Sequence, residues 1–216
     1  MTKIVTLTES GRREGRYLVE LDDASSVTVS VEAISRLRLG PGRMLDEAEL
    51  ADLREEGEIL VAYDRALDLL AFRPRSAVEL RRRLVQKGIE APRAEVAVSR
   101  LAERGLVDDR AFAVALTRSK ALGAGASKRR VGQELARRGV AREVADAAVA
   151  EVWEEEGVDQ SEVIEQLARK RLASLRGLDA PTQRRRLYGF LARRGYDADE
   201  IRRAMDAALG GDAAED

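Results

Sequence analysis

The stretch that decides the fold of this chain is Leu80-Arg81-Arg82-Arg83-Leu84-Val85-Gln86-Lys87-Gly88-Ile89, because its pattern returns twice. The second copy is VGQELARRGV at 131–140, and the third is LYGFLARRGY at 187–196. The glycines of the three copies lie 51 and then 56 residues apart. A period of this length is typical of proteins built from repeated helical units.

Each copy has the pattern of an amphipathic helix that ends at its glycine. Apolar residues four apart, such as Leu80 and Leu84, fall on one helix face and predict contact with a core. Basic residues occupy the last turn, where they oppose the negative end of the helix dipole. The glycine that follows can adopt the left-handed conformation that closes a helix. The repeat therefore predicts three similar helical units.

Each unit is expected to hold three helices. Ser76-Ala77-Val78-Glu79 has the form of a capping box at the start of the first basic helix. Pro92 begins a further helix after the first copy, and apolar residues four apart predict one after each of the others. Three short helices form a compact bundle related to the helix-turn-helix motif. A row of such bundles is expected to form an elongated, curved array.

The N-terminal segment predicts strands instead. Ile4–Thr8 and Tyr17–Leu21 are short β-prone runs, and Val27, Val29 and Val31 alternate with polar residues. Gly40-Pro41-Gly42 then interrupts the chain. We therefore expect a small β-hairpin or three-stranded meander before the helices.

The predicted fold is mainly α, with this strand module followed by the three tandem units. The expected boundaries are 1–44 for the strand module, 45–109 for the first helical repeat, 110–157 for the second and 158–216 for the third.

Composition excludes several classes of function. The 216 residues include no histidine and no cysteine, which rules out Ser-His-Asp and Cys-His catalysis, disulfides and Cys/His zinc sites. Asp108-Asp109 could hold a metal in principle, but these residues fit a helix N-cap better. Gly123-Ala124-Gly125-Ala126-Ser127 is the nearest sequence to a phosphate cradle, and it fits a loop followed by an N-cap at Ser127. We predict no enzyme, no metal and no cofactor.

Charge is distributed unevenly along the chain. The net charge is −1, but residues 61–150 hold 19 basic and 11 acidic side chains, while both ends are acidic. A basic middle favours a polyanion or an acidic protein surface as partner. A solvated helix face in an arginine-rich protein would give the same composition.

The basic side chains of the repeated helices are the candidate contact residues. One set fits stabilisation of a helix C-terminus, namely Lys87, Arg137, Arg138, Arg193 and Arg194. The other set is expected near helix starts, where cations are unfavourable, and so needs another explanation; it comprises Arg81, Arg82, Arg83, Lys128, Arg129, Arg130, Arg184, Arg185 and Arg186. Phe72, Phe112, Trp153 and Phe190 are predicted core residues, so aromatic base stacking is not expected.

Three segments resemble the RecX family. Ala66–Leu80 is similar to the opening of that family, Gly105–Ala113 to its most recognisable segment, and Leu191–Tyr196 to the motif of its third unit. The resemblance covers roughly residues 60–209, and residues 1–59 are similar to the N-terminal extension of longer members.

This resemblance implies a non-enzymatic regulator that binds the RecA filament on single-stranded DNA in its helical groove and inhibits ATP hydrolysis and strand exchange. The near-zero net charge departs from strongly basic members of the family, so we expect direct DNA binding to be weak and without sequence specificity. The longest stretch without charged residues is too short to span a bilayer, so we also expect a cytoplasmic monomer without membrane contact. Two alternatives remain open at this stage: a helix-turn-helix protein that binds duplex DNA, and a helical-repeat scaffold without a nucleic-acid role. Sequence-specific DNA binding would distinguish the duplex-DNA binder from a filament regulator. Each mismatched base pair would weaken the binding free energy of a sequence-specific protein by about 1–3 kcal/mol.

Overall fold

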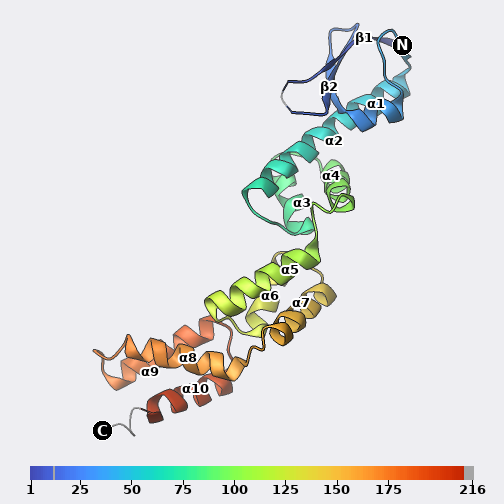
Figure 1. Cartoon of the computed structure of the whole chain (residues 1–216). Helices are drawn as coiled ribbons and strands as arrows, with labels where there is room; N and C mark the ends of the chain where they lie inside the picture. Colours follow the sequence, from blue (N-terminus) through green and yellow to red (C-terminus); the bar gives the residue numbers. More distant parts are fainter. Residues whose placement is uncertain (12, 212–216) are drawn as a thin grey trace. The chain divides into compact units, whose positions relative to one another are not determined.

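The computed structural model describes residues 1–11 and 13–211, and the chain forms two compact units, Met1–Val107 and Asp108–Asp216. The first unit contains the strand module and one three-helix group, and the second contains two three-helix groups. These elements confirm the predicted fold class (Figure 1). The exact boundaries of the repeats stay a prediction.

The strand module is a four-stranded antiparallel sheet. Its strands are β1 (Thr2–Glu9), β2 (Arg16–Leu21), β3 (Ser26–Ser30) and β4 (Met44–Leu45), in the order β3-β2-β1-β4. Alternate side chains of the strands point to one face, as the strand period of two requires. The apolar side chains buried there include Ile4, Val19, Val29 and Leu45.

Two features of this module differ from the prediction. Val31 does not extend the third strand but begins a short helix, α1 (Val31–Leu37), because the Ser30 hydroxyl accepts a hydrogen bond from the Ala33 amide and caps it. A fourth strand, β4, follows Gly40-Pro41-Gly42 and pairs with β1. The additional strand and helix give the sheet the packing partners that a three-stranded meander lacks.

The long helix α2 (Glu47–Phe72) joins the sheet to the first three-helix group (Figure 1). It begins with a capping box in which Asp46 and Glu49 each accept a hydrogen bond from the other's amide. Leu53 of α2 is buried in the core of the sheet. Further along the helix, Ala62, Tyr63 and Ala66 pack into a second core with α3 (Ala77–Gln86) and α4 (Ala91–Glu103).

The second unit holds two more groups of three helices. The first consists of α5 (Asp109–Arg118), which continues into the π-helical turn η1 (Ser119–Gly123), α6 (Lys128–Arg137) and α7 (Arg142–Glu155). The other consists of α8 (Gln160–Ala173), α9 (Ala180–Arg193) and α10 (Ala198–Gly211). Each group surrounds its own cluster of buried apolar side chains.

The local signals in the sequence have the predicted roles. Gly88, Gly139 and Gly195 all have positive φ, at +87°, +81° and +91°, as expected of helix-ending glycines. Asp108 and Ser127 cap α5 and α6, with side chains that accept hydrogen bonds from backbone amides of the first turn.

The prediction that Phe72 is a core residue is wrong. Its side chain is 84% exposed, whereas Phe112 and Trp153 are buried and Phe190 packs partly against the third helical cluster. Phe72 follows Leu70 by two residues, which turns it by about 200° around the helix axis and away from the buried stripe.

Replacement of Gly195 by alanine is expected to weaken the second unit severely. An added Cβ would lie 2.4 Å from Arg130 Cβ and 2.7 Å from Ser127 Oγ, so the two helical groups could not keep their packing. Gly157 is a matched control, because it also has positive φ but nothing lies within 4 Å of the added atom. We expect Gly157→Ala to cost about 1–2 kcal/mol and Gly195→Ala at least about 2 kcal/mol more.

Urea unfolding followed by Trp153 fluorescence measures both variants, because Trp153 is the chain's single tryptophan and lies buried in this unit. Equal losses in the two variants would contradict the close packing at Gly195.

Candidate basic interface

The three basic clusters do not occupy equivalent positions. Lys128–Arg130 forms the first turn of α6, but Arg81–Arg83 and Arg184–Arg186 lie further into α3 and α9, so the expectation that all three stand at helix starts is wrong. Counted from the glycine that ends each helix, Arg184–Arg186 matches Lys128–Arg130, whereas Arg81–Arg83 stands four residues closer to its glycine. The clusters therefore need separate assignments.

In the first cluster, on α3, two of the basic side chains have a partner within the chain, and two have none among the described residues. Arg81 forms an ion pair with Glu95, and Arg83 donates a hydrogen bond to the Gln86 side chain at 3.1 Å. Arg82 and Lys87 are exposed, and their side chains form no ion pair or hydrogen bond among the described residues. These two remain available to a partner.

The second cluster helps to join the two helical groups of its unit. Arg129 donates to the Gly195 carbonyl at 3.0 Å and to the Tyr196 carbonyl at 3.4 Å, 66 and 67 residues away. The Lys128 ammonium lies 5.7 Å from the centre of the Trp153 ring, a cation–π distance. Arg130 lines a cavity at the same junction. The positive N-terminal end of α6 thus meets the C-terminal turn of α9, a favourable arrangement of helix dipoles.

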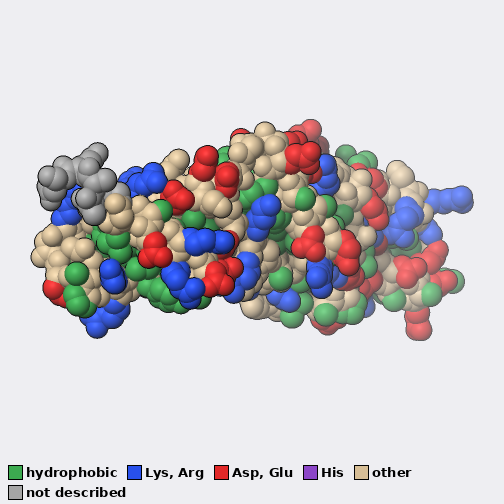
Figure 2. All heavy atoms as spheres, turned by 90° about the horizontal axis from the view of Figure 1, so that it is seen from below, with side chains coloured by type: hydrophobic (Ala, Val, Ile, Leu, Met, Phe, Trp, Pro, Cys, Tyr) green, Lys and Arg blue, Asp and Glu red, His purple; other side chains and the backbone are tan. Residues whose placement is uncertain are grey.

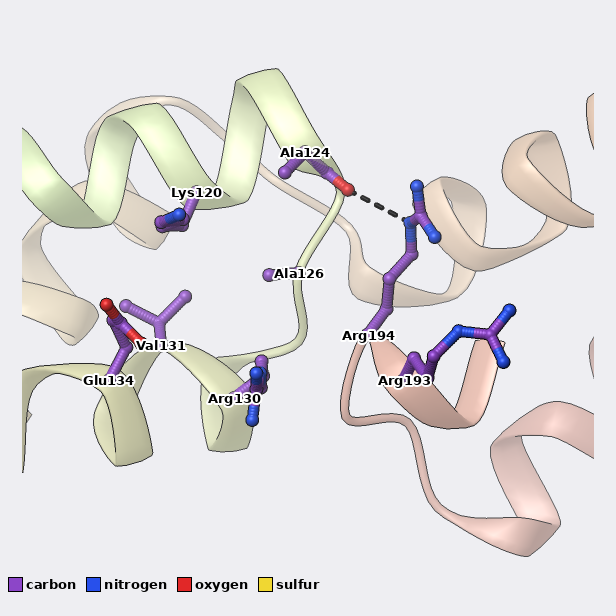
Figure 3. A pocket seen from close by; sticks show the side chains of 8 residues that line it. All are labelled: Lys120, Ala124, Ala126, Arg130, Val131, Glu134, Arg193 and Arg194. Atoms are coloured by element: carbon purple, nitrogen blue, oxygen red, sulfur yellow. Dashed lines mark hydrogen bonds between the residues drawn. The ribbon is translucent and has the colours of Figure 1, made fainter. Parts of the chain in front are cut away.

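Further contacts complete this junction (Figure 3). The Ser127 amide donates to the Arg194 carbonyl at 3.0 Å, and Arg194 Nε donates to the Ala124 carbonyl at 3.1 Å. The buried Tyr196 hydroxyl donates to the Gly125 carbonyl at 3.1 Å. Burial raises the pKa of Tyr196 to about 12, and the charge of Glu200 adds to this effect. The loop at 123–127, the nearest sequence to a phosphate cradle, therefore binds the end of α9 and Tyr196 through its backbone.

At the C-terminus of α6, two arginines share one carboxylate. Glu134 is buried, and it forms an ion pair with Arg137 and accepts a hydrogen bond from Arg138 Nε at 3.0 Å. Burial alone would raise the pKa of Glu134, but the hydrogen bond from Arg138 and the two positive charges outweigh it and lower the pKa. Arg137 and Arg138 thus have a structural role besides opposing the helix dipole.

The third cluster is the most accessible. Arg184, Arg185 and Arg186 are all exposed, and among residues 1–11 and 13–211 none of them forms an ion pair or a side-chain hydrogen bond. Arg193 is also exposed and lines the junction cavity. Figure 2 shows that Lys and Arg side chains on the face in view lie among Asp and Glu rather than in one uniform patch. Unpaired arginines therefore identify contact candidates better than the count of basic residues.

Lys120 is a further candidate residue that no pattern in the sequence indicates. It lies in η1 and lines the junction cavity opposite Arg130 (Figure 3). A π-helical turn adds a residue to the turn and so changes the direction of the side chains, which the helical period alone does not predict.

The described residues contain no group of three or more acidic, histidine or cysteine side chains placed to hold a metal ion. Asp108 is occupied as the cap of α5, because its carboxylate accepts hydrogen bonds from the Arg110 and Ala111 amides. No described helix is both long and apolar enough to cross a membrane.

The junction predicts a loss of stability at alkaline pH. The folded-state pKa of Tyr196 is about 12, above the ordinary 10.0, so its contribution is complete below pH 10 and is lost as the pH rises through 12. Tyr196→Phe removes the titrating group and one hydrogen bond, which costs about 1 kcal/mol at pH 7. Urea unfolding at several pH values should show a shallower alkaline decline for Tyr196→Phe than for the unmodified protein. Tyr188→Phe, at an exposed position, should leave the profile unchanged; identical declines in all three proteins would exclude this role of Tyr196.

Three family models match the chain in order. They describe the first three-helix domain of RecX, which matches residues 62–101, the second, which matches 108–149, and the third, which matches 159–205.

Individual RecX proteins are also similar to this chain in sequence. The regulatory protein RecX of Amycolatopsis mediterranei is 40% identical over 146 residues, a match that covers 68% of this chain and 82% of that protein. The regulatory protein RecX of Levilactobacillus brevis is 31% identical over 196 residues, covering 91% of this chain and 73% of that protein.

Two solved structures share the fold. A crystal structure of regulatory protein RecX superposes with a TM-score of 0.74 at 23% identity, covering 95% of this chain and 100% of the other. The crystal structure of RecX from Lactobacillus salivarius gives a TM-score of 0.56 at 18% identity, covering 70% of this chain and 97% of the other. At these identities the structures establish the fold alone.

Proposed function

Because the chain belongs to the RecX family of regulatory proteins, we propose that it regulates the RecA recombinase by binding the RecA filament on single-stranded DNA. The observation that carries this proposal is the presence of all three RecX three-helix domains in order along one chain. The consequence for RecA is inhibition of ATP hydrolysis and strand exchange during recombination and DNA repair. We propose a cytoplasmic monomer without a catalytic activity of its own.

The distribution of unpaired arginines supports contact with a negatively charged partner. Arg82 on α3 and Arg184–Arg186 on α9 are exposed and form no ion pair among the described residues. A long side chain with an unpaired guanidinium loses rotamer entropy on binding, but it can gain charge-assisted hydrogen bonds to carboxylates or phosphates. These four residues are therefore the proposed contacts to the groove of the filament. Lys87 on the first unit and Arg193 on the second, each exposed beside a helix-ending glycine, are proposed as additional contacts.

The remaining basic candidates serve this function less directly. Arg81, Arg129, Arg138 and Arg194 have partners within the chain, so their loss would change the fold as well as any contact. The chain's net charge of −1 supports weak direct binding to DNA, without sequence preference.

Charge reversal on α9 tests the proposal. Arg184→Glu, Arg185→Glu and Arg186→Glu combined should raise the concentration needed for half-inhibition of the RecA ATPase on single-stranded DNA at least about tenfold, because repulsion replaces several charge-assisted contacts. The fold should persist, since no described hydrogen bond or ion pair depends on these side chains and the attraction of Arg185 for the capping carboxylate of Asp179 is the smallest of the effects on that group. The thermal unfolding curve should therefore shift by little.

A matched control reverses two exposed arginines elsewhere in the same unit, Arg142 and Arg202, each of which forms only an exposed ion pair within its own helix. The control should inhibit like the unmodified protein. Inhibition that survives the α9 reversal unchanged would rule out this surface, and absence of any inhibition by the unmodified protein would rule out the proposed function.

A further inference from the structure

Arg194 is a partly buried cation without a counter-ion. Its guanidinium lies 3.7 Å from the centre of the Phe190 ring, and its described hydrogen bonds go to two neutral acceptors, the carbonyls of Ala124 and Phe190. Among the described residues, no carboxylate pairs with it. Charged groups inside proteins are normally paired, because desolvation of an unpaired charge is costly.

Neighbouring positive charges add to the unfavourable free energy of holding Arg194 charged and partly buried. Burial lowers the pKa of the Arg194 guanidinium, and the positive charges of Arg193 and Arg171 lower it further, while Tyr196 opposes the change. Arg171 also lies beside the Phe190 ring, at 5.2 Å, and its buried Nε has no hydrogen-bond partner. The cluster therefore has excess positive charge and an unused donor.

The second repeat shows how the chain neutralises the equivalent residue. Arg138 stands before Gly139 as Arg194 stands before Gly195, and it donates a hydrogen bond to Glu134, four residues earlier. In the third repeat the residue four positions earlier is Phe190. The same helix position thus carries an internal counter-ion in one repeat and lacks it in the next.

A cavity of about 170 Å³ lies beside Arg194, and four of the residues that line it are basic (Figure 3). Lys120 lines it from η1, Arg130 from α6, and Arg193 and Arg194 from the end of α9. Lys120 and Arg130 form no ion pair among the described residues. Glu134 is the only carboxylate among the described residues that line the cavity, and it is already bound by two arginines outside it.

We propose that this cavity binds a phosphate-bearing anion, which supplies the counter-ion that Arg194 lacks. Lys120, Arg130 and Arg194 would hold the phosphate oxygens, in the manner of charge-assisted hydrogen bonds. Because these residues come from both helical groups of the second unit, bound anion stabilises the junction between the groups. The phosphate belongs either to a small polyphosphate or to a nucleic-acid backbone. The proposal does not depend on RecA.

Thermal unfolding of the full-length protein, followed by Trp153 fluorescence with and without inorganic pyrophosphate at constant ionic strength, tests the proposal. Millimolar pyrophosphate should raise the melting temperature by at least about 3 °C, more than chloride or acetate does. Phe190→Glu should abolish this response, because it places a carboxylate where the second repeat has Glu134. Phe190→Gln is the matched control, since it also removes the ring but adds no charge, and it should keep the response.

Arg194→Gln provides a second variant that should lose the response, even if Phe190→Glu does not fold. Lys120→Gln should raise the half-saturating pyrophosphate concentration several-fold, whereas Arg142→Gln, at the start of α7 and outside the cavity lining, should not.

The same experiment with a single-stranded oligonucleotide identifies the source of the phosphate. Stabilisation by DNA and not by pyrophosphate, lost in the same variants, assigns the phosphate to a nucleic acid. If neither pyrophosphate nor the oligonucleotide stabilises the protein more than chloride does, or if the response persists in Arg194→Gln, the proposal is overturned. Each of these results is independent of RecA inhibition.

Discussion

The left-handed turn at a helix-ending glycine is the constraint on which this structure depends. The turn at Gly195 exposes the carbonyls just beyond the end of α9: Arg129 donates to those of Gly195 and Tyr196, and the Ser127 amide donates to that of Arg194. The end of one helix thus becomes the docking site for the start of another. A side chain at Gly195 would collide with both Arg130 and Ser127. Backbone conformation, helix dipoles and packing therefore act together at one residue of the repeat.

This constraint explains why basic residues that look equivalent have different roles. Arg129 and Arg185 occupy the same position relative to their glycines, but α9 begins a full turn earlier than α6, so Arg185 remains exposed on the helix surface. Arg129 instead reaches a carbonyl of the next helical group. One arginine therefore stabilises the fold, while the other is available to a partner.

The sequence predicted those features whose causes are local. Helix ends at Gly88, Gly139 and Gly195 and caps at Ser76 and Ser127 follow from conformational preference and short-range hydrogen bonds, and the structure confirms them. The prediction was wrong at Val31, where the cap at Ser30 outweighs the β preference of valine. Contacts of Arg129 with residues more than sixty positions away could not be predicted, because spacing along the chain does not show which turn a side chain will reach. The sequence also shows Glu134 four residues before Arg138 and Phe190 four residues before Arg194. This difference indicates a missing counter-ion only when the structure shows that Arg194 is partly buried.

The account rests on the separation of structural from contact arginines, and a comparison of Arg129→Ala with Arg185→Ala tests it most directly. Both variants would be measured by urea unfolding of the second unit and by inhibition of the RecA ATPase. We predict that Arg129→Ala lowers the free energy of unfolding by about 1–3 kcal/mol, since it removes hydrogen bonds from a charged donor. Arg185→Ala should leave unfolding unchanged and weaken inhibition. Equal effects of the two variants on unfolding, or a loss of inhibition in Arg129→Ala alone, would contradict the account.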